Sequence, residues 1–342
     1  MSTKEILVFG AAGFIGTYLI DELLRQNYRV VASDISEIGK EYYKEKSISY
    51  LFIDITDKDN FEKIPSKKYD AVIHVAALQP ANISSKSFDP RNYIKVNVIG
   101  TLNILEFCRK NEVGKLIYAS SHRNTQGLWS RKKAIREEDG RCQKNSGEYA
   151  LFSISETAAQ DCIEYYENEH GIKSIIFRLP PVYGYGPHTE IFKEGKPILT
   201  GFQTFIENAM SGKPLEIWGD SSVGRDIIYV KDVVSAFMKA LEKENVRGLY
   251  NIASGTYLTL QEQVELTARV FWRGDTKPVF VTKPEKEHKM DSFIYDNGKA
   301  KKELDWCPQY SFEDMLIDYK KEMQNQRFQY LVEKRKKMFQ EA

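Results

Sequence analysis

A glycine-rich turn near the amino terminus constrains the fold of this chain more than any other feature. The apolar run Ile6–Phe9 ends in Gly10, Gly13 and Gly16, and the amphipathic segment Phe14–Gln26 follows at once. This order predicts a strand, a tight turn and a helix. The glycines would permit the turn, the approach of a pyrophosphate and close helix–strand packing, and the helix N-terminus would offer unpaired N–H groups. The sequence therefore predicts a dinucleotide-phosphate site.

An acidic residue stands where a dinucleotide site requires one. The second apolar run, Arg29–Ser33, ends in Asp34, about 20 positions beyond the turn. A carboxylate at this place hydrogen-bonds a ribose 2′-OH and repels a 2′-phosphate, which favours NAD over NADP. The alternative is a plain strand–turn–helix with an unrelated aspartate.

Strands and helices alternate through the first half of the chain. The expected elements are Ile6–Phe9, Phe14–Gln26, Arg29–Ser33, Ile48–Ile53, Asn60–Ile64, Ala71–Val75, Asn92–Lys110 and Leu116–Ala119. Such alternation predicts an α/β fold with a parallel sheet and helices on both faces. Ligands of these sheets bind at the carboxyl ends of the strands. Asp34, Asp54, His74–Ala77, Ser120 and Ser121 are expected there.

Composition excludes several classes of protein. The 342 residues are 42% hydrophobic, enough for one large domain or two joined ones, and 49 basic residues balance 48 acidic ones. Neither a nucleic-acid nor a membrane partner is expected. We expect a cytoplasmic protein, because no secretory signal or apolar run of about 20 residues is present. The four cysteines lack CxxC spacing, so we expect reduced, structural thiols and no metal site.

Several motifs extend along the chain beyond the glycine turn. They are His74–Ala77, Val96–Asn103, Tyr149, Arg178–Gly184, Trp218–Asp232 and Tyr250–Gly255. Together with the turn, they resemble the extended short-chain dehydrogenase/reductase family, in particular the NAD-dependent epimerases and dehydratases of nucleotide sugars. The resemblance implies a Rossmann-type doubly wound parallel sheet with a smaller α/β C-terminal substrate domain. It also implies NAD as cofactor, a nucleotide sugar as the small-molecule substrate, and a homodimer formed through the helices at 93–110 and 149–170.

Domain boundaries and ligand contacts follow from the same resemblance. The NAD-binding domain is expected at 1–179 with 226–254, the substrate-binding domain at 180–225 and 255–325, and a C-terminal helical extension at 326–342. Cofactor contacts are expected from Gly10, Gly13, Phe14, Ile15, Gly16, Asp34, Ile35, Asp54, Ile55, Ala76, Ala77, Gln79, Asn97, Ser120, Tyr149, Ser153 and Pro180. Substrate contacts are expected from His122, Pro181 and Arg225. Arg225 would meet a diphosphate, and its alternative is a salt bridge to Asp220 or Asp226.

The expected catalytic residues are Tyr149, His122 and Ser121, and here the chain departs from the family. The family pairs its tyrosine with a lysine four residues on, but Ser153 stands at that position. Losing the lysine removes on the order of 4 kcal/mol of help in forming the phenolate, roughly a thousandfold in active base. His122 stands where a small hydroxyl is expected. It could act as acid/base, with turnover following an ionisation at about pH 6 to 7.5, or as a cation beside Tyr149.

Other interpretations of this region stay open. Arg123 is a second candidate for the missing positive charge, and His122 could instead be an ordinary loop residue beside a decayed site. Pro181 replaces an asparagine that binds phosphates in many relatives, and it offers no donor. The basic segment 124–146 is expected to form a mobile lid, unless its charges are simply solvated. The run Tyr319–Phe339 is expected to be an amphipathic helix docked on the protein's own core.

Two functions remain open from the sequence. One is an enzyme that oxidises a sugar carbon transiently and returns the hydride. The other is an NAD-binding, catalytically impaired sensor or partner subunit. The glycine turn serves both, whereas the combination of Tyr149, Asn97 and Arg225 favours the enzyme.

Overall fold

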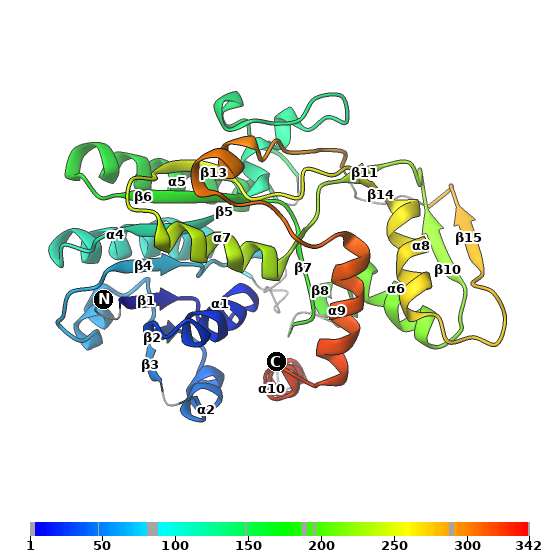
Figure 1. The fold of residues 1–342 in the computed structure, drawn as a ribbon, viewed down its shortest axis with the longest axis horizontal. Coiled ribbons are helices and arrows are strands. Elements are labelled where there is room, and N and C mark those ends of the chain that lie inside the picture. Colours follow the sequence, from blue (N-terminus) through cyan, green and yellow to red (C-terminus); the bar gives the residue numbers. More distant parts are fainter. Residues whose placement is uncertain are drawn as a thin grey trace.

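A seven-stranded parallel sheet forms the larger part of the molecule (Figure 1). The computed structural model describes residues 4–46, 48–80, 88–147, 149–186, 190–193, 196–286 and 291–340. The strands are β1 (Glu5–Phe9), β2 (Arg29–Asp34), β3 (Ser49–Phe52), β4 (Ala71–His74), β5 (Leu116–Ser121), β6 (Ser174–Leu179) and β13 (Gly248–Asn251). Their order is β13-β6-β5-β4-β1-β2-β3, and each neighbouring pair is parallel. The predicted fold class is confirmed.

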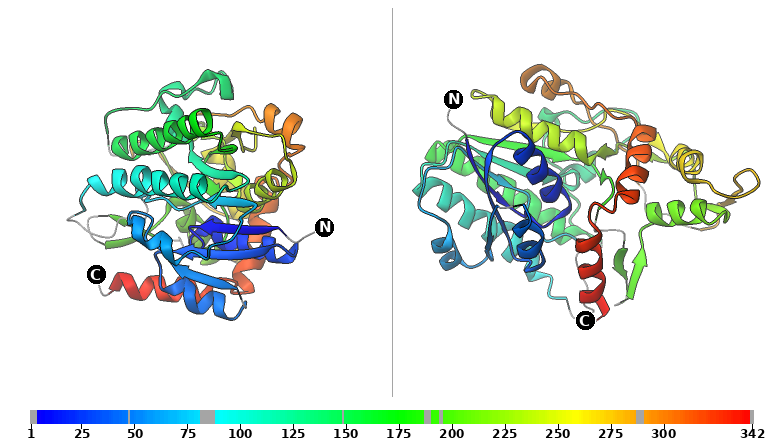
Figure 2. Two further views of the ribbon diagram at one scale, coloured as in Figure 1. Left: turned by 90° about the vertical axis from the view of Figure 1, so that its left-hand side faces the viewer. Right: turned by 60° about the horizontal axis from the view of Figure 1, so that its bottom comes forward.

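Helices cover both faces of this sheet because its central strand is apolar on both sides. Ile6 and Val8 of β1 lie in one core with residues of α1 (Phe14–Arg25) and α7 (Val230–Glu242). Leu7 and Phe9, which point the other way, lie in a second core with residues of α4 (Gly100–Lys110) and α5 (Ala150–His170). Figure 2 shows α4 and α5 side by side on this second face.

Short helical segments connect the strands of the first half. They are α2 (Ile38–Lys44), the 3₁₀ segments η1 (Lys58–Lys63), η4 (His122–Leu128) and η5 (Glu137–Asp139), α3 (Arg91–Tyr93) and the π-helical turn η3 (Ile94–Ile99) that continues into α4. The sequence did not predict α2, a helix whose N-cap residue Glu37 makes no side-chain cap hydrogen bond. The other elements predicted in this half are present, with ends shifted by a few residues.

The smaller part of the molecule lies beyond the carboxyl edge of the large sheet (Figure 1). Its elements are β7 (Val182–Tyr183), β8 (Glu190–Lys193), β9 (Lys196–Leu199), α6 (Gly201–Met210), β10 (Leu215–Trp218), β11 (Gly224–Arg225), β12 (Ile228–Tyr229), β14 (Leu258–Thr259), α8 (Leu260–Phe271), β15 (Phe280–Lys283) and α9 (Phe312–Gln324). The π-helical turn η6 (Ala300–Leu304) packs instead against α7 of the larger part. Thr200, Thr259 and Ser311 cap α6, α8 and α9 by accepting a backbone N–H with the side-chain hydroxyl. Hydroxyl residues therefore fix where these three helices begin.

The chain after residue 318 forms two helices, not the single helix that the sequence predicts. The first helix, α9, ends at Gln324, and α10 spans Gln329–Gln340. Gln326 has a φ of 51°, a left-handed conformation that a continuous helix does not allow. The predicted docking on the protein's own core is confirmed, because Phe328 and Leu331 are buried and α10 packs against α2 (Figure 2).

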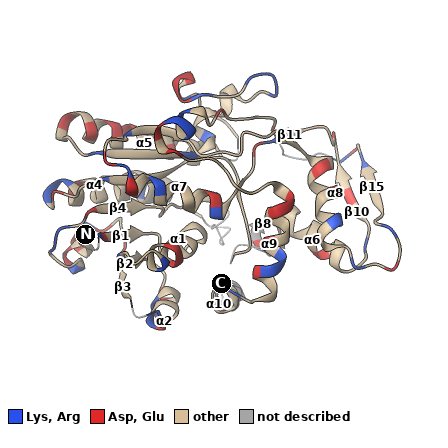
Figure 3. Ribbon diagram, in the orientation of Figure 1, with Lys and Arg blue, Asp and Glu red and all other residues tan. Residues whose placement is uncertain are grey.

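Charge is evenly mixed over the molecule. Figure 3 shows Lys and Arg interspersed with Asp and Glu along most helices, as expected from the balanced composition. Among the described residues, no helix is both long enough and apolar enough to cross a membrane.

Candidate active site

The strand ends of the large sheet bring most of the predicted site residues to one edge. Gly10 follows β1, Asp34 ends β2, Ala76 follows β4, and Ser121 ends β5. Because the strands are parallel, their carboxyl ends lie on the same side, which we call the carboxyl edge. This edge is where open α/β sheets bind ligands.

The glycine turn is shaped by close backbone contacts. Gly10 has a φ of 90°, and a Cβ there would lie 2.5 Å from the backbone nitrogen of Ala76. A Cβ on Gly16 would overlap the carbonyl oxygen of Gly10. Gly13 is the N-cap of α1 and has no side chain to cap the first turn. The N-terminus of α1 can therefore present N–H groups to a phosphate, so the turn fits a dinucleotide.

Asp34 joins the glycine turn to the end of β2. Its Oδ2 accepts the N–H of Ala12 at 3.0 Å, and its Oδ1 accepts the N–H of Ser36 at 3.0 Å. Burial raises the pKa of this carboxyl, and these backbone hydrogen bonds oppose the rise. The neighbouring Ile35 is exposed, with 58% of its surface open, which provides an apolar face beside the carboxylate.

The predicted contacts after β3 and β4 differ in exposure. Oδ1 of Asp54 accepts both the N–H and the hydroxyl of Thr56, at 2.9 and 2.8 Å. Ile55 is buried, and its carbonyl accepts the side-chain amide of Asn103 at 2.8 Å. Ala76 and Ala77 are half-buried and Gln79 is exposed.

Asn97 occupies the π-helical turn and holds the loop after β4. Its side chain accepts the N–H of Leu78 at 2.8 Å and donates to the carbonyl of Leu78 at 3.1 Å and to the hydroxyl of Ser155 at 3.0 Å. Asn97 is buried. It therefore fixes the loop that contains Ala76 and Ala77 against α5, which places it behind the cofactor position.

Tyr149 and Ser153 lie at the start of α5. Tyr149 is half-buried and is the N-cap residue of the helix. Ser153 is fully buried, and its hydroxyl donates to the carbonyl oxygen of Tyr149 at 3.0 Å. Ser153 thus satisfies a backbone group of the first helical turn and brings no charge to the tyrosine.

His122 is held against two aromatic rings at the start of η4. Its ring stacks on Trp129 and on Phe293, with centroids 5.5 and 5.4 Å apart. Nδ1 lies 3.2 Å from the carbonyl oxygen of Leu179, and because a carbonyl only accepts, Nδ1 carries the hydrogen. Desolvation, and then the charges of Arg123 and Arg225, lower the pKa of His122 well below its usual value. This lowered pKa favours a neutral His122 over an imidazolium beside Tyr149, which was one of the roles left open by the sequence.

Arg123 contacts Tyr149 directly. Its guanidinium carbon lies 4.3 Å from the ring centroid of Tyr149 and 5.5 Å from that of Trp129. The side chain of Ser121 caps η4 by accepting the N–H of Arg123 at 3.2 Å. Ser120 is buried behind this turn, where its hydroxyl accepts from the side-chain amide of Asn124.

Arg225 reaches the site from β11. Its Nη2 donates to the hydroxyl of Tyr183 at 3.0 Å, while its buried Nε has no hydrogen-bond partner. The carboxylate of Asp226 accepts from Ser254, Gly255 and Tyr295. An orphaned guanidinium N–H of this kind is suited to an anionic ligand.

The prolines that follow β6 complete the edge. Pro180 is buried and Pro181 is half-buried. The carbonyl of Pro181 accepts the N–H of Ile228 at 3.1 Å, which joins β7 to β12. Within the described residues, no group of three or more His, Cys, Asp or Glu side chains could hold a metal ion.

Comparison of the chain with models of known protein families identifies its family. The model described as the NAD dependent epimerase/dehydratase family matches residues 6–253. The chain belongs to this family. Its membership accords with the glycine turn, Asp34 and Tyr149 on one edge.

Individual relatives extend the similarity over nearly the whole chain. A putative UDP-glucose 4-epimerase of Methanocaldococcus jannaschii is 29% identical over 310 residues, 90% of this chain and 95% of the relative. A dTDP-4-dehydro-6-deoxyglucose reductase of Escherichia coli is 27% identical over 315 residues, 90% and 94% of the two chains. The structure of UDP-glucose 4-epimerase from Thermotoga maritima with UDP-glucose superposes with a TM-score of 0.77 at 27% identity, covering 94% of this chain and 99% of that one.

The basic segment 124–146 is anchored, in contrast to the mobile lid expected for it. Arg178, a fully buried arginine of β6, donates to the carbonyl oxygens of Arg136 and Gly140, the second at 3.2 Å. The side chain of Asn251 donates to the carbonyl of Ile135 at 3.0 Å, and Glu137 accepts the N–H of Asn251 at 2.7 Å. The segment is therefore attached to the large sheet by buried hydrogen bonds.

A buried polar cluster lies behind the site, between β4, β5 and α5. The Nε2 of His74 lies 3.0 Å from the hydroxyl of Thr101, and the His74 ring lies 5.1 Å from that of Tyr118. The hydroxyl of Tyr118 is 3.5 Å from the Oε2 of Glu156, whose Oε1 has no partner. Burial lowers the pKa of His74 to about 3 and raises that of Glu156 to about 8. Burial therefore favours the neutral form of both groups.

Sequence reasoning did not identify the aromatic wall of the site. Trp129 and Phe293 stack on each other with centroids 4.6 Å apart, and both rings contact His122. Phe293 reaches this place through a β-bridge with Arg225. No sequence signal links these residues, because Phe293 is far along the chain from both.

Proposed function

We propose that the protein is an NAD-dependent enzyme that acts on a nucleotide sugar by transient hydride transfer. The observation that carries the proposal is that Tyr149, in contact with Arg123 after β5, and the glycine turn after β1 lie at the same carboxyl edge of the sheet. The buried, unpaired Nε of Arg225 adds a group suited to an anion. The UDP-glucose 4-epimerase of Thermotoga maritima, which this chain resembles over 94% of its length, is a structure with UDP-glucose.

Each part of the site has a role in this proposal. The α1 N-terminus and Asp34 would hold the pyrophosphate and a ribose 2′-OH, and Ile35 would contact the adenine. Asn97 would hold the loop of Ala76 and Ala77 against the cofactor. Bound NAD supplies an acceptor for a hydride from the sugar.

The substrate side rests on three residues. Tyr149 would take the proton of the sugar hydroxyl as that carbon is oxidised and return it when the carbonyl is reduced. Arg225, oriented by the hydroxyl of Tyr183, would bind the diphosphate. Pro181 offers no donor, so the diphosphate would rely more on Arg225 and on backbone N–H groups.

The first test measures cofactor choice. Titration calorimetry should show tighter binding of NAD(H) than of NADP(H), because the Asp34 carboxylate accepts from a 2′-OH and repels a 2′-phosphate. An NADP preference, or no binding of either, would reject the assignment.

The second test measures turnover. UDP-glucose, UDP-glucuronate, UDP-N-acetylglucosamine and dTDP-glucose are incubated with the NAD-loaded protein, and products are followed by NMR. Conversion of at least one of them is expected. Arg225→Ala should bind the sugar nucleotide more weakly by about 1.5 to 3 kcal/mol, and its affinity for NAD should be unchanged. NAD binding without conversion of any sugar would favour the sensor or partner subunit.

The organisation of the whole protein forms part of the proposal. We propose an NAD-binding domain at 1–179 with 226–254, a substrate-binding domain at 180–225 and 255–325, and a C-terminal extension. The return of residues 248–251 to the large sheet as β13 supports this division. We also propose a homodimer, supported by exposed apolar side chains on η3 and α5, and a cytoplasmic location, supported by the four free cysteines.

A further inference from the structure

We propose that Arg123 supplies the positive charge that stabilises the phenolate of Tyr149, in the role that lysine has in the family. This inference rests on the proposed function, because Tyr149 needs a phenolate only if it accepts a proton from a sugar hydroxyl. It identifies an arginine on the turn after β5, not a residue of α5, as the partner of the tyrosine.

The position that the lysine would occupy is held by Ser153, which has no charge. Ser153 is one helical turn after Tyr149, but it is fully buried and its hydroxyl donates to the backbone carbonyl of Tyr149. It carries no charge and points its only polar group at the backbone. The compensating cation must therefore come from another element.

Arg123 is held next to the Tyr149 ring by the turn after β5. Its backbone N–H is fixed by the Ser121 hydroxyl at 3.2 Å, and its guanidinium carbon lies 4.3 Å from the centroid of the Tyr149 ring. Trp129 contacts the same guanidinium at 5.5 Å. A cation at this distance attracts the neutral ring, and it attracts the ring more strongly once the oxygen has lost its proton.

The other basic side chains of the site are less suited to supply a positive charge to Tyr149. His122 is a neutral imidazole, since burial and the nearby charges of Arg123 and Arg225 lower its pKa. Arg225 directs Nη2 to the hydroxyl of Tyr183, on the diphosphate side of the proposed substrate. Arg141 is paired with Asp161 and Glu164, which lie farther along α5. Arg123 is the cation whose contact with the Tyr149 ring is direct.

The proton balance of the step is simple. The phenolate of Tyr149 takes the hydroxyl proton of the sugar while the hydride leaves the same carbon for NAD, and both return when the carbonyl is reduced. Arg123 keeps its proton throughout and acts only through its charge. It is therefore a positioning and electrostatic residue, and Tyr149 is the catalytic one.

The first experiment needs no substrate or cofactor. Phenolate absorbance near 295 nm is titrated against pH in wild type and Arg123→Gln, and the contribution of Tyr149 is obtained by subtracting Tyr149→Phe in each background. In wild type this contribution should appear at a pH lower by about one unit or more, as an opposite charge within about 4 to 6 Å produces. Identical titrations in the two backgrounds would overturn the inference.

The second experiment is a double-mutant cycle on turnover of the sugar identified above. Arg123→Gln should lower kcat about tenfold or more and move the acidic limb of the pH profile, where activity rises as the phenolate forms, to higher pH. Adding Arg123→Gln to Tyr149→Phe should change little. Arg123→Lys should retain part of the activity, because it keeps the charge and loses the planar stacking. A full additional loss in the Tyr149→Phe background would show that Arg123 does not act through the tyrosine.

Two controls separate this inference from other failures. The melting temperature and NAD affinity of Arg123→Gln should match those of wild type, which excludes a general structural effect. If no sugar is converted by wild type, the proposed function fails, yet the phenolate titration of the ligand-free protein still decides on Arg123.

Discussion

At the scale of single residues, burial favours the neutral form of two titratable side chains, His122 in the candidate site and Glu156 behind it. His122 combines a ring stacked on Trp129 and Phe293 with an Nδ1–H donated to the carbonyl of Leu179. Desolvation dominates the lowering of its pKa, so the turnover ionisation expected at about pH 6 to 7.5 does not belong to this histidine. Its bare Nε2 can still accept a proton or a hydrogen bond as a neutral imidazole.

We therefore predict that His122 stays neutral from pH 6 to 8, with its hydrogen on Nδ1. The measurement is NMR of ¹⁵N-labelled imidazoles, in which the His122 signals are assigned by their loss in His122→Gln. A group whose folded pKa is depressed loses stabilisation as pH falls below the unfolded value of about 6.5. As the pH is lowered, His122→Gln should accordingly lose less stability than wild type. A protonated His122 ring at pH 7 would refute the prediction.

Glu156 provides a second residue-scale prediction. Its buried carboxyl has a pKa raised from 4.5 to about 8, and within the described part of the chain its hydrogen bond is a long one, 3.5 Å from the hydroxyl of Tyr118. A raised carboxyl pKa means that stability present below the unfolded pKa is lost as pH rises through the folded pKa. Glu156→Gln removes this loss, so the variant should gain about 1 to 3 kcal/mol at pH 7.5 and almost nothing at pH 4.

Urea unfolding of Glu156→Gln at several pH values measures the effect. Glu169→Gln, an exposed change near the end of the same helix, is the matched control and should show no such pH-dependent gain. A gain that is the same at every pH would mean that the ionisation of Glu156 is not its source.

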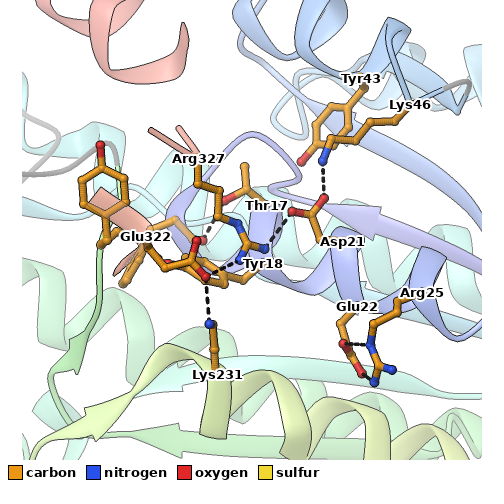
Figure 4. Close-up of polar contacts among 12 residues, drawn as sticks. Thr17, Tyr18, Asp21, Glu22, Arg25, Tyr43, Lys46, Lys231, Glu322 and Arg327 are labelled. Carbon is orange, nitrogen blue, oxygen red and sulfur yellow. Dashed lines mark hydrogen bonds and ion pairs between the residues drawn. The ribbon is translucent and has the colours of Figure 1, made fainter. Parts of the chain in front are cut away.

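At the scale of elements, the turn between α9 and α10 ties the two parts of the molecule together. Arg327 donates to Asp21 of α1 at 2.8 Å and to Glu322 of α9 at 2.9 Å, and its guanidinium lies 4.3 Å over the ring of Tyr18 (Figure 4). Lys231 of α7 pairs with the same Glu322 at 2.8 Å. The turn therefore links helices of the sheet to a helix of the smaller part.

We predict that Arg327→Met lowers the free energy of unfolding by about 1 to 3 kcal/mol, because it breaks a largely buried ion network. Figure 4 also contains the matched control, Arg25, whose pair with Glu22 lies on the surface. Arg25→Met should leave the denaturant midpoint almost unchanged, since exposed pairs contribute little. Equal midpoints for the two variants would show that the Arg327 network does not stabilise the fold.

The segment after β7, which contains Tyr185, connects this turn to the candidate site. The hydroxyl of Tyr18 donates to the carbonyl of Tyr185 at 2.7 Å, and the ring of Tyr185 packs on Tyr319 and Phe328. Tyr185 lies two residues after Tyr183, which orients Arg225. The C-terminal turn thus supports the loop on which the proposed diphosphate site depends.

Sequence patterns anticipated the elements whose cause is local. The apolar run Ile6–Phe9 and the three glycines that follow it were enough to predict the strand, the turn and α1. The patterns did not show α2, or the break at Gln326, after which Phe328 packs on Tyr18, a residue far away in the sequence. The contact of Arg123 with Tyr149 was open for the same reason, since it depends on how two elements meet.

At the scale of the whole molecule, the face formed by α4 and α5 is the proposed dimer interface. The two helices lie side by side over the sheet (Figure 2), joined by the hydroxyl of Tyr166, which donates to Glu106 at 2.7 Å. Ile99 and Tyr165 are exposed on η3 and α5, with 43% and 56% of their surfaces open. Large apolar side chains on one face are typical of an interaction surface.

We predict that the protein is a dimer in solution and that Ile99→Lys with Tyr165→Lys weakens it at least tenfold. In a two-fold interface each substitution occurs twice, and every added lysine must lose water or meet a like charge, so even a modest cost per site is doubled. Ile317→Lys, an exposed apolar position on α9, is the control and should leave the dimer intact. Light scattering over a range of concentrations measures the three proteins. A monomer at every concentration of wild type, or equal dissociation of both variants, would place the interface elsewhere or remove it.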